Sequence, residues 1–398
     1  MDKYAAKRQR FQEIMTQYED QWDRAKQELK TLLQEGIAKN DMYLIAAANY
    51  WLGVAHFRAG DKGELLSYAL KGAAFFVESD DYLMAARSYN LLAVVYTLSE
   101  EYLLAIDTYQ KAYDILIKHP CKGFKITSIL MNFAANFFRM GDLKNAIEYA
   151  ERCREELKEG DTEHDRILFM IGENLSCYYE ADGQYEKALE RAAIMKEAMD
   201  RGKCLPEDES CYYVRLSSIA FATDKTEKGI AYADKVIAIG NVGAGEHEPQ
   251  DDYERIALSL IRIPDYKRAA VFIGYLKDYC GQTDIVTDKL IYYRSKAAYF
   301  EATGDEKEVL VCFRALKECY ETQKKESLAT ERLIRKQLND TMEDIKELTR
   351  KVKENEKGAL TDSLTGQNTK AFMDRVMEEW RANPADQALD ISCYFKTQ

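Results

Sequence analysis

The chain has 398 residues, 5 prolines and a formal net charge of −12. Its acidity disfavours nonspecific contact with nucleic acid or anionic membranes, so we expect neither as a partner. The length exceeds what one compact core usually holds and indicates several units or a repeat array. The longest apolar stretch, residues 43–57, is too short to span a membrane, and the charged first residues are not a signal peptide, so we expect a cytoplasmic protein.

A short pattern recurs along residues 1–320: a turn, often Gly-Asp, is followed by a bulky residue and, three positions later, by a small one. The clearest copies are Gly141-Asp142-Leu143 with Ala146 and Gly183-Gln184-Tyr185 with Ala188. The last position of the pattern, the phase mark, falls at residues 25, 65, 105, 146, 188, 229, 269 and 309. A step that stays between 40 and 42 residues predicts a tandem repeat.

Most repeats also carry a small residue twelve positions before the phase mark. These residues are Gly53, Ala93, Ala134, Ser176, Ser217, Ala257 and Ala297. A small residue lets the first helix of a hairpin pack closely on the second, and the Gly-Asp turn would end one helix and cap the next. The layout resembles the tetratricopeptide repeat, which implies an all-α superhelix of about eight helical hairpins. HEAT or armadillo repeats, which share the longer period, are the structural alternative.

The same resemblance implies a concave face, lined by the first helix of each hairpin, that takes a protein or peptide ligand. The residues carried over to that face are Tyr50, Arg87, Asn90, Met131, Asn132, Arg139, Glu173, Asn174 and Arg294. An asparagine there can grip a peptide backbone, because its side chain offers both a donor and an acceptor. For each residue the alternative is a solvated or inter-repeat polar side chain.

Residues 321–358 are predicted to form a charged helix, because they contain no proline and no glycine before Gly358, where we expect the helix to end. Apolar residues recur in it at intervals of three, four and seven, as in a short coiled coil. They are Ile334, Leu338, Ile345, Leu348 and Val352. We therefore expect a weak parallel homodimer through this seam, which Thr341 interrupts. The alternative is one amphipathic helix that folds back on the array.

Two stretches follow in residues 359–398. The first contains Asp362, Leu364, Thr365, Gly366, Asn368 and Phe372, and the second is Leu389-Asp390-Ile391-Ser392-Cys393-Tyr394-Phe395-Lys396. Together they resemble the start of the GGDEF domain of diguanylate cyclases. The resemblance implies that Asp390 is a latent metal ligand and that Phe395 and Lys396 are latent phosphate-loop residues. We expect this segment to be an N-terminal fragment of such a domain, a small incomplete α/β stub.

The Gly-Gly-(Asp/Glu)-Glu-Phe turn that names the family, with its second acidic metal ligand, does not occur in the sequence. We therefore expect no catalytic residues and no cofactor in the chain; Mg²⁺ and GTP would bind only to a complete domain. The order of segments predicts a cytoplasmic sensor module of a diguanylate-cyclase-type signalling protein with a truncated, inactive output. Incubation with GTP and magnesium should yield no cyclic di-GMP. The alternative is a stand-alone interaction scaffold or peptide-responsive regulator.

Overall fold

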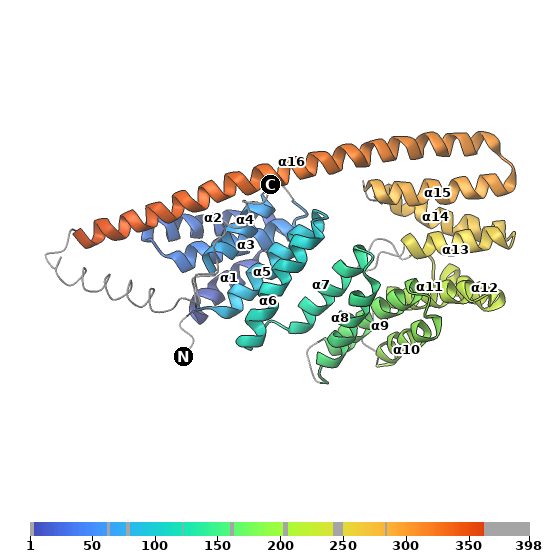
Figure 1. Cartoon of the computed structure of the whole chain (residues 1–398), viewed down its shortest axis with the longest axis horizontal. Helices are drawn as coiled ribbons and strands as arrows, with labels where there is room; N and C mark the ends of the chain where they lie inside the picture. Colours follow the sequence, from blue (N-terminus) through green and yellow to red (C-terminus); the bar gives the residue numbers. More distant parts are fainter. Residues whose placement is uncertain are drawn as a thin grey trace.

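The computed structural model describes residues 4–61, 64–76, 80–121, 123–159, 163–201, 206–241, 250–282 and 285–361. These residues form helices joined by turns, with no strand among them (Figure 1). The helices are α1 (Ala5–Gln17), α2 (Trp22–Lys39), α3 (Met42–Arg58), α4 (Leu65–Phe76), α5 (Tyr82–Leu98), α6 (Tyr102–Lys118), α7 (Ile126–Arg139), α8 (Leu143–Glu156), α9 (His164–Ala181), α10 (Tyr185–Asp200), α11 (Pro206–Ala222), α12 (Thr226–Ile239), α13 (Gln250–Arg262), α14 (Tyr266–Gln282), α15 (Val286–Thr303) and α16 (Glu306–Thr361).

Each odd-numbered helix packs against the even-numbered helix that follows it, so the described part of the chain is a row of helical hairpins. The phase marks of the sequence lie in the first turn of the even-numbered helices. The five marks occupied by alanine are fully buried: Ala25, Ala105, Ala146, Ala188 and Ala269. The predicted repeat and its step are therefore confirmed.

The turn between the helices of a hairpin has the predicted chemistry. Gly141 has φ +78°, a left-handed conformation that favours glycine, and Asp142 then accepts a hydrogen bond from the Asn145 backbone N–H at 3.2 Å. Asp305 caps α16 in the same way after Gly304, with a hydrogen bond of 3.2 Å from the Glu308 N–H. The Gly-Asp pairs therefore mark the points where one helix ends and the next begins.

The small residues twelve positions before the marks are all buried between helices. The Ser217 hydroxyl donates a hydrogen bond of 2.9 Å to the carbonyl of Gly229, the phase mark of the same hairpin. At Gly53 an added Cβ would come within 2.9 Å of Leu91 in the next hairpin. Larger side chains at these positions would force the helices apart.

Buried apolar side chains form clusters that follow one another along the array. The cluster around Phe133 and Tyr109 belongs to the N-terminal hairpins, and that around Tyr253 and Phe272 to α11–α14. Such nearest-neighbour packing is typical of repeat arrays. The first cluster has one member from far along the chain, Ile334 of α16, so this last helix belongs to the N-terminal core as well.

Helix α16 is 56 residues long and corrects the predicted bounds of the charged helix. It begins at Glu306 as the second helix of the last hairpin, passes residue 321 without a break, and continues past Gly358 to Thr361. The segment has no proline, and one glycine costs a helix only about 1 kcal/mol. From α15 the helix runs back beside the array to α4 (Figure 1).

The predicted dimer seam contacts the chain's own array. The Ile334 side chain is buried, and Leu338 and Ile345 pack against the same N-terminal cluster. The Thr341 hydroxyl donates a hydrogen bond of 3.1 Å to the Ser67 hydroxyl of α4, and Lys71 pairs with Asp344 at 2.7 Å.

The structure thus has the folded-back helix that was the alternative to the coiled coil. Apolar residues at intervals of three and four mark one face of a helix, whichever partner that face meets. The side chains of Leu348 and Val352, and residues 362–398 with almost all of the predicted stub, lie outside the part that the structure describes.

Candidate ligand-binding face

All nine residues predicted to line a ligand groove lie on odd-numbered helices, the first helix of each hairpin. Tyr50 is on α3, Arg87 and Asn90 on α5, and Arg294 on α15. The remaining five are on the adjacent helices α7 and α9: Met131, Asn132, Arg139, Glu173 and Asn174. We call the surface formed by these positions the odd-helix face.

Two of the asparagines contact each other between hairpins. The Asn132 side-chain amide donates a hydrogen bond of 3.2 Å to the Asn90 side-chain oxygen. One helical turn further, the Thr97 hydroxyl donates to the Asn136 side-chain oxygen at 3.0 Å. These pairs hold α5 against α7, and the second donor of Asn132 stays available for another partner.

Three further predicted residues also bridge neighbouring hairpins. The Arg87 guanidinium donates a hydrogen bond of 2.6 Å to the Gly123 carbonyl, and Arg294 forms a bidentate ion pair with Glu254. The Cys211 thiol donates to the Glu173 carboxylate at 2.8 Å. Burial, and after it the charge of Glu173, raises the pKa of that thiol well above its ordinary value, which keeps Cys211 protonated as a donor.

The other four predicted residues differ in exposure. Tyr50 is buried in the first apolar cluster, with its ring edge-to-face with Trp51 at 5.1 Å between ring centroids. Met131 is half-buried against the second cluster. Asn174 is half-buried and Arg139 exposed, and the structure gives neither side chain a hydrogen bond within the described residues. These last two side chains have the most freedom to meet a ligand.

The most extensive polar group on the face was not predicted. It consists of Glu180 on α9, Arg215 and Ser218 on α11, and Asp252 and Arg255 on α13, and we call it the Arg215 network. Arg215 donates to Glu180 at 2.9 Å and to Asp252 at 2.7 Å. Ser218 donates to Glu180 at 2.6 Å. Arg255 completes the group with ion pairs of 3.2 Å to Glu180 and 3.1 Å to Asp252.

The network is buried at its centre and open at one edge. The side chains of Arg215 and Glu180 are each 5% exposed, whereas that of Arg255 is 40% exposed. Burial lowers the pKa of Arg215, but the neighbouring charges, Asp252 first, outweigh this effect and raise the pKa well above its ordinary value. Two carboxylates thus hold two guanidinium groups in place, and only the outer guanidinium faces solvent.

A signal for the network was present in the sequence. Asn132, Asn174, Arg215 and Arg255 each lie fourteen residues before the phase mark of their own repeat, in four successive repeats. The prediction carried over the two asparagines at this position but omitted the two arginines. The odd-helix face therefore has one equivalent polar side chain per repeat from α7 to α13.

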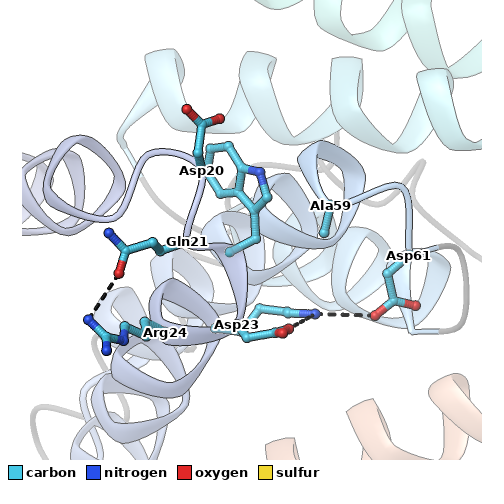
Figure 2. A pocket seen from close by; sticks show the side chains of 8 residues that line it. Asp20, Gln21, Asp23, Arg24, Ala59 and Asp61 are labelled. Carbon is cyan, nitrogen blue, oxygen red and sulfur yellow. Dashed lines mark hydrogen bonds and ion pairs between the residues drawn. The ribbon is translucent and has the colours of Figure 1, made fainter.

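The structure also has a polar surface pocket outside this face, at the turns before α2 and after α3. It is lined by Asp20, Gln21, Trp22, Asp23, Arg24, Lys26, Ala59 and Asp61 (Figure 2). Lys26 pairs there with Asp23 at 2.9 Å and with Asp61 at 3.4 Å, and Arg24 donates to Gln21 at 2.9 Å. Of these contacts, the Lys26–Asp61 ion pair links the first hairpin to the second.

The described ranges contain no group of three or more His, Cys, Asp or Glu side chains arranged to hold a metal ion. None of their helices combines the length and apolar character that a membrane span requires. The latent ligand Asp390 and the phosphate-loop residues Phe395 and Lys396 lie outside these ranges.

Neither protein-family models nor curated proteins match the sequence. Solved structures with a similar fold include the apo form of RapI, at 16% identity and TM-score 0.59, covering 79% of this chain and 84% of that one. Aspartyl phosphate phosphatase F from Bacillus subtilis is similar at 15% identity and TM-score 0.53, covering 72% and 74%. A tetratricopeptide repeat protein from Parabacteroides merdae has 16% identity and TM-score 0.50, covering 72% and 99%. The chain has a tetratricopeptide-like helical-repeat fold.

Proposed function

We propose that the chain is a regulatory module that binds a peptide or an extended protein segment on the odd-helix face. The observation that carries the proposal is the equivalent polar position of Asn132, Asn174, Arg215 and Arg255 in four successive repeats. Asn132, Asn174 and Arg255 are partly exposed and offer donors to a ligand, while the buried Arg215 anchors the carboxylates that hold Arg255. Donors at a regular step suit an extended chain, whose carbonyl groups also recur at a regular step. The cytoplasm is the proposed location.

Asn174 and Arg139 provide the cleanest test of this function, because neither side chain holds the array together through a hydrogen bond within the described residues. Peptides would be selected on the wild-type protein from a phage-displayed random-peptide library and measured by calorimetry. The double variant Asn174→Ala with Arg139→Ala should bind the selected peptides at least tenfold more weakly, a loss of about 1.4 kcal/mol or more.

Glu190→Ala provides the matched control. Glu190 lies on the even-numbered helix α10 with a 66% exposed side chain, so its removal should leave the affinity unchanged. Equal affinity of the wild type and the double variant for every selected peptide would contradict binding on the odd-helix face.

We further propose that the module belongs to a diguanylate-cyclase-type signalling protein and that α16 connects it to the output. The support is the GGDEF-like pattern of residues 362–372 and 389–396, which directly follows the long helix. In this arrangement residues 330–355 of two copies pair weakly in parallel. The direct test is the coding sequence after residue 398: an in-frame Gly-Gly-Glu-Glu-Phe turn supports the cyclase, and a stop codon supports the alternative, a scaffold or peptide-responsive regulator without enzymatic output.

A further inference from the structure

Helix α16 connects two regions of the array that are far apart in the sequence. Its first part packs against α15, with Cys312 and Cys319 buried in this half. Its second part reaches α4, where Thr341 contacts Ser67 across 274 positions of the sequence (Figure 1). The helix and the hairpins from α4 to α15 thus form a closed loop. We call residues 334–345 of α16 the docking segment.

The contacts of the docking segment with α4 are of a kind that can be released. Ser67 and Lys71 lie one helical turn apart on α4 and receive Thr341 and Asp344 of α16. Asp344 is 62% exposed, and ion pairs at such exposed positions contribute little to stability. The apolar contribution comes from Ile334, Leu338 and Ile345, which cover the edge of a core that the N-terminal hairpins already form.

Because α16 is one continuous helix, its docking on α4 depends on the shape of the array. Between Cys319, which is buried beside α15, and Ile334 the helix advances fifteen residues, or roughly 22 Å at 1.5 Å per residue. The docking segment meets α4 only while the hairpins between α4 and α15 keep the matching curvature. A ligand on the odd-helix face lies along those hairpins, so it can favour one curvature over another.

The residues that dock are also the residues that a coiled coil would need. Ile334, Leu338, Thr341 and Ile345 alternate at intervals of four, three and four, as in a heptad seam. One face of a helix cannot contact both α4 and a second copy of α16. We propose that α16 is an autoinhibitory latch: docked on α4 it keeps the chain monomeric, and released by a change in array curvature it pairs with the α16 of a second copy. This proposal rests on the pairing proposed above, while the docking is tested separately.

The test opens the latch without altering α16. The double variant Ser67→Glu with Lys71→Glu, which we call the α4 variant, places two carboxylates against Thr341 and Asp344. It leaves every residue of the docking segment unchanged. Lys267→Glu with Ala270→Glu on the exposed side of α14 is the control, because it changes the charge by the same amount. Molar mass from light scattering and the radius of gyration from X-ray scattering are measured over a concentration series. The α4 variant should have a larger radius and an apparent dimer dissociation constant at least tenfold lower than the wild type and the control.

A second variant separates opening from pairing. Adding Leu338→Asp and Ile345→Asp to the α4 variant should restore the monomer while the larger radius per chain persists. If the α4 variant loses helicity, Asp344→Lys takes its place. This substitution lies at an exposed position facing Lys71, and it should shift the molar mass and the radius in the same direction as expected for the α4 variant. An α4 variant with the wild-type radius, or one that opens and stays monomeric, overturns the latch. The affinity of the same variants for the selected peptides is measured as well, so that a failure of peptide binding on the odd-helix face can be told apart from a failure of the latch.

Discussion

Replacing Arg215 by alanine should lower the free energy of unfolding by about 3–5 kcal/mol, because it leaves two buried carboxylates with one partly exposed partner. Glu180 and Asp252 both point at Arg215, at 2.9 and 2.7 Å, and little solvent reaches them. Urea unfolding followed by far-UV circular dichroism measures the effect. Because repeat arrays can unfold in parts, hydrogen exchange should show the loss of protection in α9–α13 and little change in α3–α6.

Two comparison variants show whether the charge is responsible. Arg10→Ala removes a guanidinium that is 52% exposed from an ion pair with Glu35, whose side chain is 28% exposed, so it should cost about 1 kcal/mol or less. The triple variant Arg215→Met, Glu180→Leu and Asp252→Leu replaces the buried charges with apolar side chains of similar size, so it should recover most of the lost stability. If the free energy of unfolding of Arg215→Ala lies within about 1 kcal/mol of the wild-type value, the network does not hold these hairpins together.

The double variant Leu338→Asp with Ile345→Asp should detach the second half of α16 while the array stays helical. A fully buried large apolar side chain contributes about 1.5–3 kcal/mol to stability. The stabilisation lost with two half-buried ones is therefore larger than the contribution of the single exposed Lys71–Asp344 ion pair. Hydrogen exchange should therefore show faster exchange in residues 334–349 and unchanged protection in 306–319. Light scattering should show a monomer, because the variant has lost its pairing seam too.

The control for this variant is Leu328→Asp, at a position of α16 where the leucine side chain is 47% exposed. It introduces one negative charge, half of what the double variant adds, one to two turns before the docking segment and should leave exchange in residues 334–349 unchanged. Equal protection of these residues in the wild type and the double variant would show that Leu338 and Ile345 do not hold the helix on α4.

The sequence was sufficient to predict the hairpin array, because each repeat requires a few residues for steric reasons. A buried small residue must be present at positions such as Ala146 and Ala134, and a left-handed turn followed by a cap requires residues such as Gly141 and Asp142. The left-handed residue recurs before every even-numbered helix and the small residues recur in most hairpins, so both appear in the sequence as a period. Single contacts that occur once in the fold leave no such period.

Two features could be predicted only in part for that reason. The stripe of Ile334, Leu338 and Ile345 identifies the buried face of a helix but not the surface that buries it, since α4 lies about 270 residues away in the sequence. The Arg215 network needs carboxylates from two other repeats, and Glu180 and Asp252 occupy different positions within theirs. Predicting either feature requires knowledge of how the hairpins stack.

Docking of α16 on α4 is tested most directly by a disulfide between Ser67→Cys and Thr341→Cys, whose hydroxyl oxygens lie 3.1 Å apart. Nitrogen-15-labelled and unlabelled double variants are mixed at low concentration, oxidised mildly and digested without reductant for mass spectrometry. The latch predicts a bridge between residues 67 and 341 within one chain, and none when Leu328→Cys replaces Thr341→Cys. A missing bridge, or one that joins mainly labelled to unlabelled chains, would show that α16 does not dock on its own array.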